Sequence, residues 1–76
     1  MILNKDTHPT RNFYYIGALV IKILASEKSV EVDVFKTYQK LRHTEEVGIN
    51  VFMLTLNWLF LLNLIGTQKG KIVKCF

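Results

Sequence analysis

The sequence predicts a small α+β domain of the winged-helix type, in which three helices are closed by a C-terminal β-hairpin. Two apolar stretches, residues 13–25 and 50–64, are too long for strands and indicate helices. A charged stretch over 34–46 lies between them and also has helical spacing. Near the C-terminus, the strand-like segments 64–67 and 71–75 flank a short glycine-containing loop, which indicates a hairpin.

The composition indicates one small folded domain. Half of the 76 residues are apolar and 21% are charged, which excludes a disordered chain. Residues 1–12 are polar after residue 3 and hold the only proline, so we expect an N-terminal arm there and a single domain over 13–76. A domain of this size buries only about 60% of its unfolded surface, so we expect support from another protein chain.

The first predicted helix, residues 13–25, contains a single charged residue, Lys22. Helical spacing predicts one core-facing side, made of Phe13, Ile16, Val20, Ile23 and Leu24. Gly17 interrupts this helix at a cost of about 1 kcal/mol, and glycine inside a helix often marks the close approach of a neighbouring segment.

The middle of the chain predicts a short strand followed by a helix. Residues 30–32 alternate with the period of a strand. Asp33 is then the expected N-cap, because its carboxylate accepts hydrogen bonds from the free amides of a first helical turn. In the helix over 34–46, the residues expected to face inward are Val34, Phe35, Tyr38 and Leu41.

The third predicted helix, residues 50–64, has no Lys or Arg and carries apolar residues on two sides. At 100° per residue, one stripe comprises Val51, Leu54, Trp58, Leu61 and Ile65. The other, on nearly the opposite side, comprises Phe52, Leu56, Leu59 and Phe60. We assign the first stripe, with Trp58, to the core, although the period alone leaves open which stripe faces inward.

The second stripe would be exposed on an isolated monomer, and such apolar patches mark partner-binding surfaces. We therefore expect a protein-binding adaptor, which forms a homodimer in isolation or joins a larger complex. The expected interface residues are Phe52, Leu56, Leu59, Phe60, Tyr14 and Tyr15. The alternative for this helix is a central position covered on both sides, but little chain is left to cover it.

DNA binding is the alternative function, in which a winged helix acts as a regulator. A recognition helix presents basic or amide side chains to DNA, and the absence of Lys and Arg from residues 50–64 argues against it. A DNA-binding form would use the second helix and the hairpin, through Lys36, Lys40, Arg42, Lys69, Lys71 and Lys74. The hairpin lysines are more simply explained as solvated residues that protect a sheet edge.

Catalysis and membrane insertion are not expected. No phosphate-binding loop, catalytic Ser/His/Asp set or metal-ligand spacing occurs, since His8, His43 and Cys75 are scattered singly. We therefore expect no metal and no cofactor. The apolar run over 49–65 is short for a membrane span and contains three Asn. The start has no secretory pattern, so we expect a cytoplasmic protein.

Three stretches together carry a family resemblance: residues 13–18, 52–62 and 70–76. In these stretches the chain resembles the small middle component, type six, of bacterial ABC-three-component systems. They are packing patterns and contain no chemical motif. The resemblance implies an accessory subunit that works with an SMC-like or Rad50-like ABC ATPase and a further component, in defence against phage and other foreign DNA. It defines no catalytic or binding residues.

Overall fold

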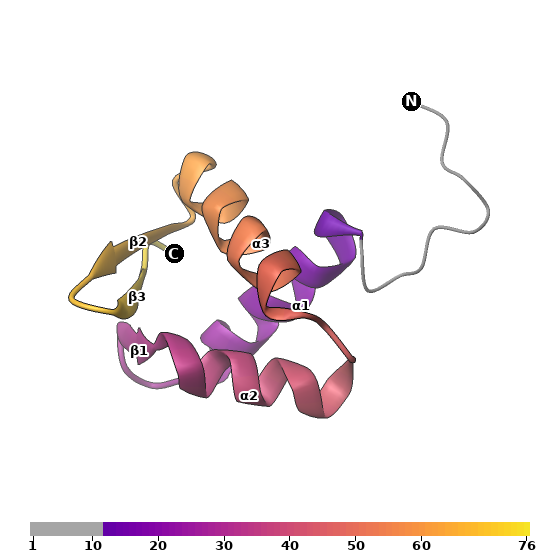
Figure 1. The fold of residues 1–76 in the computed structure, drawn as a ribbon. Coiled ribbons are helices and arrows are strands. Elements are labelled where there is room, and N and C mark those ends of the chain that lie inside the picture. The colour runs from indigo at the N-terminus through magenta and orange to yellow at the C-terminus, as the bar shows by residue number, and fades with distance from the viewer. Residues whose placement is uncertain (1–11) are drawn as a thin grey trace.

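The computed structural model describes residues 12–76, which form three helices and three strands (Figure 1). In chain order the elements are α1 (Phe13–Ser26), β1 (Glu31–Asp33), α2 (Val34–Thr44), α3 (Ile49–Leu61), β2 (Ile65–Gln68) and β3 (Lys71–Lys74). The predicted α+β architecture and the predicted order of elements are confirmed. Apart from Asn12, the expected N-terminal arm lies outside the described residues.

The three strands form one antiparallel sheet with the order β1-β3-β2. Val32 of β1 and Thr67 of β2 both lie opposite Ile72 of the central strand. Lys69 and Gly70 connect β2 to β3, and both have positive φ angles, 50° and 77°, as a type I′ hairpin turn requires. The predicted hairpin is therefore confirmed, and the arrangement of helices and strands is compatible with a winged helix.

The first two helices begin at side-chain caps, and the third does not. The side chain of Asn12 accepts hydrogen bonds from two amides of the first turn of α1. Asp33 accepts a hydrogen bond of 3.0 Å from the amide of Lys36, which confirms it as the N-cap of α2. Gly48 precedes α3 without a side-chain cap. Packing therefore contributes more than capping to the position of α3.

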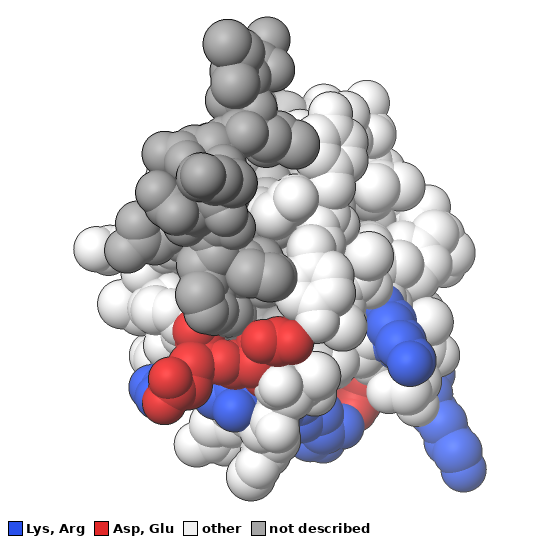
Figure 2. Space-filling view, turned by 90° about the vertical axis from the view of Figure 1, so that its right-hand side faces the viewer, with Lys and Arg blue, Asp and Glu red and all other residues white. Residues whose placement is uncertain are grey.

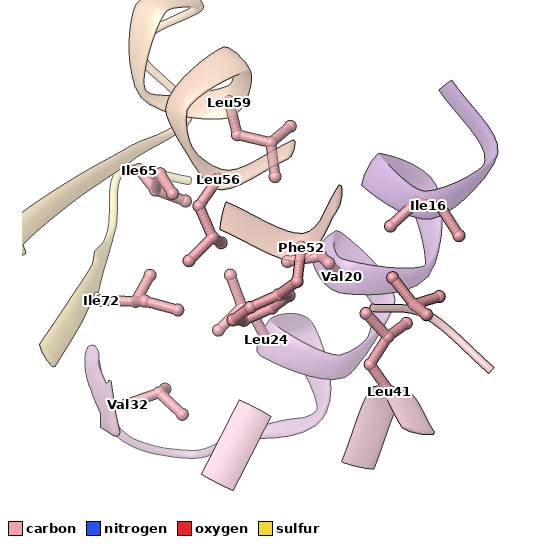
Figure 3. Close-up of a cluster of buried hydrophobic side chains, with 11 residues drawn as sticks. Ile16, Val20, Leu24, Val32, Leu41, Phe52, Leu56, Leu59, Ile65 and Ile72 are labelled. Carbon is pink, nitrogen blue, oxygen red and sulfur yellow. The ribbon is translucent and has the colours of Figure 1, made fainter. Parts of the chain in front are cut away.

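The core lies between the three helices and one face of the sheet (Figure 3). Phe52 of α3 points into the centre of this cluster, close to Val20 and Leu24 of α1, while Ile72 of β3 approaches from the sheet. The buried cluster comprises Ile16, Val20, Leu24, Val32, Leu41, Val47, Phe52, Leu56, Leu59, Ile65 and Ile72. Every helix and every strand contributes to it, so a single core holds the described chain together.

The orientation of α3 expected from the sequence is wrong in part. Ile65 is buried and Val51 and Trp58 pack against the core, as expected, but five other assignments are reversed. Phe52, Leu56 and Leu59, which were assigned to an exposed stripe, are at most 8% exposed and lie in the core. Leu54 and Leu61, which were assigned to the core, are 55% and 69% exposed. Both stripes are apolar, so helical spacing cannot distinguish them. The packing of α1, α2 and the sheet against one side decides the orientation.

Two aromatic residues expected in the core are on the surface, and two threonines are buried. Phe13 is 39% exposed and Phe35 is 70% exposed. Thr37 and Thr55 are fully buried. Each threonine hydroxyl donates a hydrogen bond to the backbone carbonyl four residues earlier, at 2.9 Å and 2.7 Å. The buried hydroxyls are thereby satisfied within their own helices.

Candidate partner-binding surface

The outer side of α3 is uncharged and largely apolar. Its large apolar side chains are 46% to 69% exposed, and we call them the α3 surface: Met53, Leu54, Phe60 and Leu61. Asn50 and Asn57 are exposed on the same side of the helix. In Figure 2, the charged side chains lie in the lower half of the face shown, and the described residues above them are uncharged. The α3 surface therefore has the character of a protein-binding patch.

Only part of the expected interface lies on this surface. Phe60 is exposed, as expected. Phe52, Leu56 and Leu59 belong to the core, where a partner cannot reach them without disrupting the domain. Met53 was missed because it falls in neither of the two stripes.

Tyr14 extends the apolar patch from α3 onto α1. Its side chain is 77% exposed, and its ring meets the ring of Trp58 edge-on, with 5.2 Å between the centroids and 75° between the planes. Gly17 makes this contact between helices possible, because a Cβ atom there would lie 2.9 Å from Cζ3 of Trp58. The expectation that Gly17 marks a close approach is confirmed. Trp58 is half-buried between the core and the patch.

Tyr15, the other tyrosine expected at the interface, is already engaged within the fold. Its hydroxyl donates a hydrogen bond of 2.5 Å to Oε1 of Glu45, directly after α2. This hydrogen bond to the carboxylate is the main cause that raises the pKa of Tyr15, because it stabilises the protonated hydroxyl. This hydrogen bond connects the start of α1 to the segment between α2 and α3. Tyr14 is therefore the better candidate for partner contact.

Two of the six residues considered for nucleic-acid contact form ion pairs with Glu27. The ammonium of Lys40 lies 2.7 Å from Oε2 of Glu27, and that of Lys36 lies 3.4 Å from Oε1. The hydrogen bond from Lys40 is the largest cause that lowers the pKa of Glu27. These lysines connect α2 to the end of α1. The single carboxylate of Glu27 therefore offsets one of the two positive charges inside the domain.

Lys74, a third member of that set, stabilises the end of α1. Its ammonium donates hydrogen bonds to the backbone carbonyls of Leu24, at 3.0 Å, and Glu27, at 2.7 Å. A cation at a helix C-terminus satisfies free carbonyl groups and interacts favourably with the helix dipole. The expectation of a solvated or phosphate-binding Lys74 is therefore corrected, because this side chain is part of the fold.

The other three basic candidates do not converge on one surface. Arg42 lies in the last turn of α2, whereas Lys69 occupies the hairpin turn and Lys71 begins β3. α3 itself contributes no basic residue. Within residues 12–76, these three cations do not form the row that follows a phosphate backbone.

A family model described as ABC-three component (ABC-3C) system Middle Component 6 matches residues 2–75. The chain belongs to this family. The match confirms the resemblance seen in the sequence, and it makes this middle component one part of a multi-component system. No curated protein and no solved structure matches the middle component.

Residues 12–76 of the middle component contain no cluster of three or more His, Cys, Asp or Glu side chains that could hold a metal ion. None of their helices has both the length and the apolar character that a membrane crossing requires.

Proposed function

We propose that this middle component is a non-catalytic, protein-binding adaptor that joins other components of its ABC-3C system. The observation that carries the proposal is the α3 surface. In a winged-helix arrangement this helix would be the one presented to DNA, but here its outer side exposes large apolar side chains and no charge. Apolar groups gain free energy when a partner removes them from water.

The energetics of protein interfaces support this assignment. A few large side chains commonly dominate an interface, and truncating one of them costs about 2 kcal/mol or more. Phe60 and Leu61 are exposed near the end of α3, and Tyr14 adds an exposed aromatic ring on α1. The two lysines of α2 are both held by Glu27, which offsets one of their two positive charges and so reduces the charge that could attract DNA.

We propose an SMC-like or Rad50-like ABC ATPase and a further system component as the partners, with a role in defence against foreign DNA. The sequence resemblance implies these partners, and the family match supports membership of such a system. In the absence of partners, we expect two copies to associate through the α3 surface as a homodimer.

Co-purification with the other components of the system tests the proposal. Leu54→Asp and Leu61→Asp each place a charge on the α3 surface, at positions that are 55% and 69% exposed. Both variants should fold and should lose most of their partner. Val30→Asp is the matched control, because Val30 is 58% exposed outside α3. If the two α3 variants retain the partner as well as the control does, the α3 surface is not the interface.

A further inference from the structure

The basic residues of α2 lie on two sides of the helix, and only one of these sides has a carboxylate nearby. Lys36 and Lys40 project toward Glu27 and share its single carboxylate. Arg42 lies on another side of the helix, where no carboxylate of residues 12–76 comes within ion-pair distance. Among residues 12–76, Arg42 is therefore the basic residue of α2 that has no carboxylate partner.

Arg42 borders an open pocket between α2 and the first residue of α3. The pocket has a volume of about 790 Å³, and we call it the Arg42 pocket; it is lined by Phe35, Tyr38, Gln39, Arg42, His43 and Ile49. No acidic side chain lines it. Phe35 is 70% exposed and Ile49 is 44% exposed, so large apolar groups lie beside the cation.

Tyr38 supports the guanidinium of Arg42. The central carbon of the guanidinium lies 5.9 Å from the centroid of the Tyr38 ring, within cation–π distance. Tyr38 is itself fixed, because its hydroxyl donates to the carbonyl of Val47 at 2.8 Å and its ring packs 4.9 Å from that of Phe52. An arginine stacked in this way keeps its planar N–H donors free to bind a carboxylate through two hydrogen bonds.

We propose that the Arg42 pocket binds an acidic segment of another component of the system. A carboxylate of that segment would pair with Arg42, and a neighbouring apolar side chain would pack against Phe35 and Ile49. The charge of the pocket is complementary to such a segment. The inference rests on the proposed adaptor function and adds a second contact with its own specificity.

The surroundings favour an acidic protein segment over nucleic acid. Binding along a phosphate backbone draws on several free cations, and in this region Lys36 and Lys40 are already paired. The pocket is also continuous with the α3 surface, because Ile49 and Met53 are one helical turn apart on the same side of α3. A partner bound to the α3 surface can therefore extend into the pocket.

The test measures the affinity of the full chain for each purified component of its system, with substitutions in the pocket. Arg42→Glu and Phe35→Ala should each weaken binding by about tenfold or more, as expected for central interface residues. Arg42→Lys should fall between Arg42→Glu and the wild type, because it keeps the charge and loses the paired donors. Lys28→Glu is the control, with the same charge reversal at an exposed bend. Circular dichroism verifies that every variant is folded.

The possible outcomes separate this inference from the adaptor function. If Leu61→Asp abolishes binding while Arg42→Glu and Phe35→Ala bind like the wild type, the proposed role of the Arg42 pocket is wrong and the proposed adaptor function stands. If no component binds the wild type, both are overturned. If the chain instead binds duplex DNA with a steep salt dependence that Arg42→Glu removes, the pocket contacts nucleic acid and the inference is wrong.

Discussion

Replacing Leu59 and Leu54 by alanine, one at a time, tests which side of α3 stabilises the domain. The two residues have the same side chain and lie in the interior of the same helix. Leu59 is 2% exposed and belongs to the core, whereas Leu54 is 55% exposed on the α3 surface. A difference in unfolding free energy between the two variants therefore reports burial alone.

The structure gives different magnitudes for the two positions. Removing a buried leucine side chain costs about 2 to 5 kcal/mol, since a cavity adds to the lost transfer free energy. A chain of 76 residues has a total stability of about 4 to 11 kcal/mol. Leu59→Ala should therefore remove a large fraction of the stability. The side chain of Leu54 is about half exposed and buries less apolar surface, so Leu54→Ala should cost less than about 1 kcal/mol.

Urea unfolding followed by circular dichroism measures both values. Tryptophan fluorescence gives a second signal, because Trp58 is half-buried beside the core. Leu59→Ala should unfold at a clearly lower urea concentration than the wild type, and Leu54→Ala should unfold close to it. If Leu54→Ala is as destabilising as Leu59→Ala, the orientation of α3 described above is incorrect.

Lys74→Met should lower the unfolding free energy by about 1 to 3 kcal/mol, because the carbonyls at the end of α1 lose a charged donor. Lys69→Met in the hairpin turn should change it by less than about 0.5 kcal/mol in the same urea assay. The pKa of Glu27 is lower in the folded than in the unfolded chain, so its stabilisation is complete above the unfolded-state pKa and disappears as the pH falls through the folded-state pKa. Glu27→Gln should therefore reduce the loss of stability in acid, and an unchanged stability–pH curve would contradict this ion pair. Gly17→Ala should shift the fluorescence of Trp58 and should not give the gain of about 1 kcal/mol expected from helix propensity, because the new Cβ would lie 2.9 Å from its ring. An unshifted spectrum would show that the two helices are not in close contact.

The features predicted correctly from the sequence have local causes. Asp33 caps α2 through an amide three residues away. The hairpin follows from two strand-like segments around Lys69 and Gly70, whose positive φ angles suit the turn. The long apolar stretches have helical spacing, which needs no information from distant residues. The order of elements could therefore be predicted before their packing was known.

The features that the sequence could not determine depend on distant contacts. Leu54 and Leu56 are the same amino acid, two positions apart on one helix, yet one is exposed and the other is 8% exposed. Only the placement of α1 and the sheet distinguishes them. Thr37 and Thr55 were not expected in the core, because a hydroxyl counts as polar until its internal hydrogen bond is known. Burial in a domain this small is decided by tertiary packing.

The same limit applies to charge. The sequence has a formal net charge of +4, which suggests nucleic-acid binding only if the cations are free. The structure places Lys36 and Lys40 on Glu27 and Lys74 on the carbonyls of α1, and none of these contacts is adjacent in the sequence. These three lysines therefore help to stabilise the fold, although Glu27 offsets only one of their positive charges. The α3 surface itself has no charged side chain, so partner binding through it should depend little on salt, and the salt-dependent part should originate from Arg42.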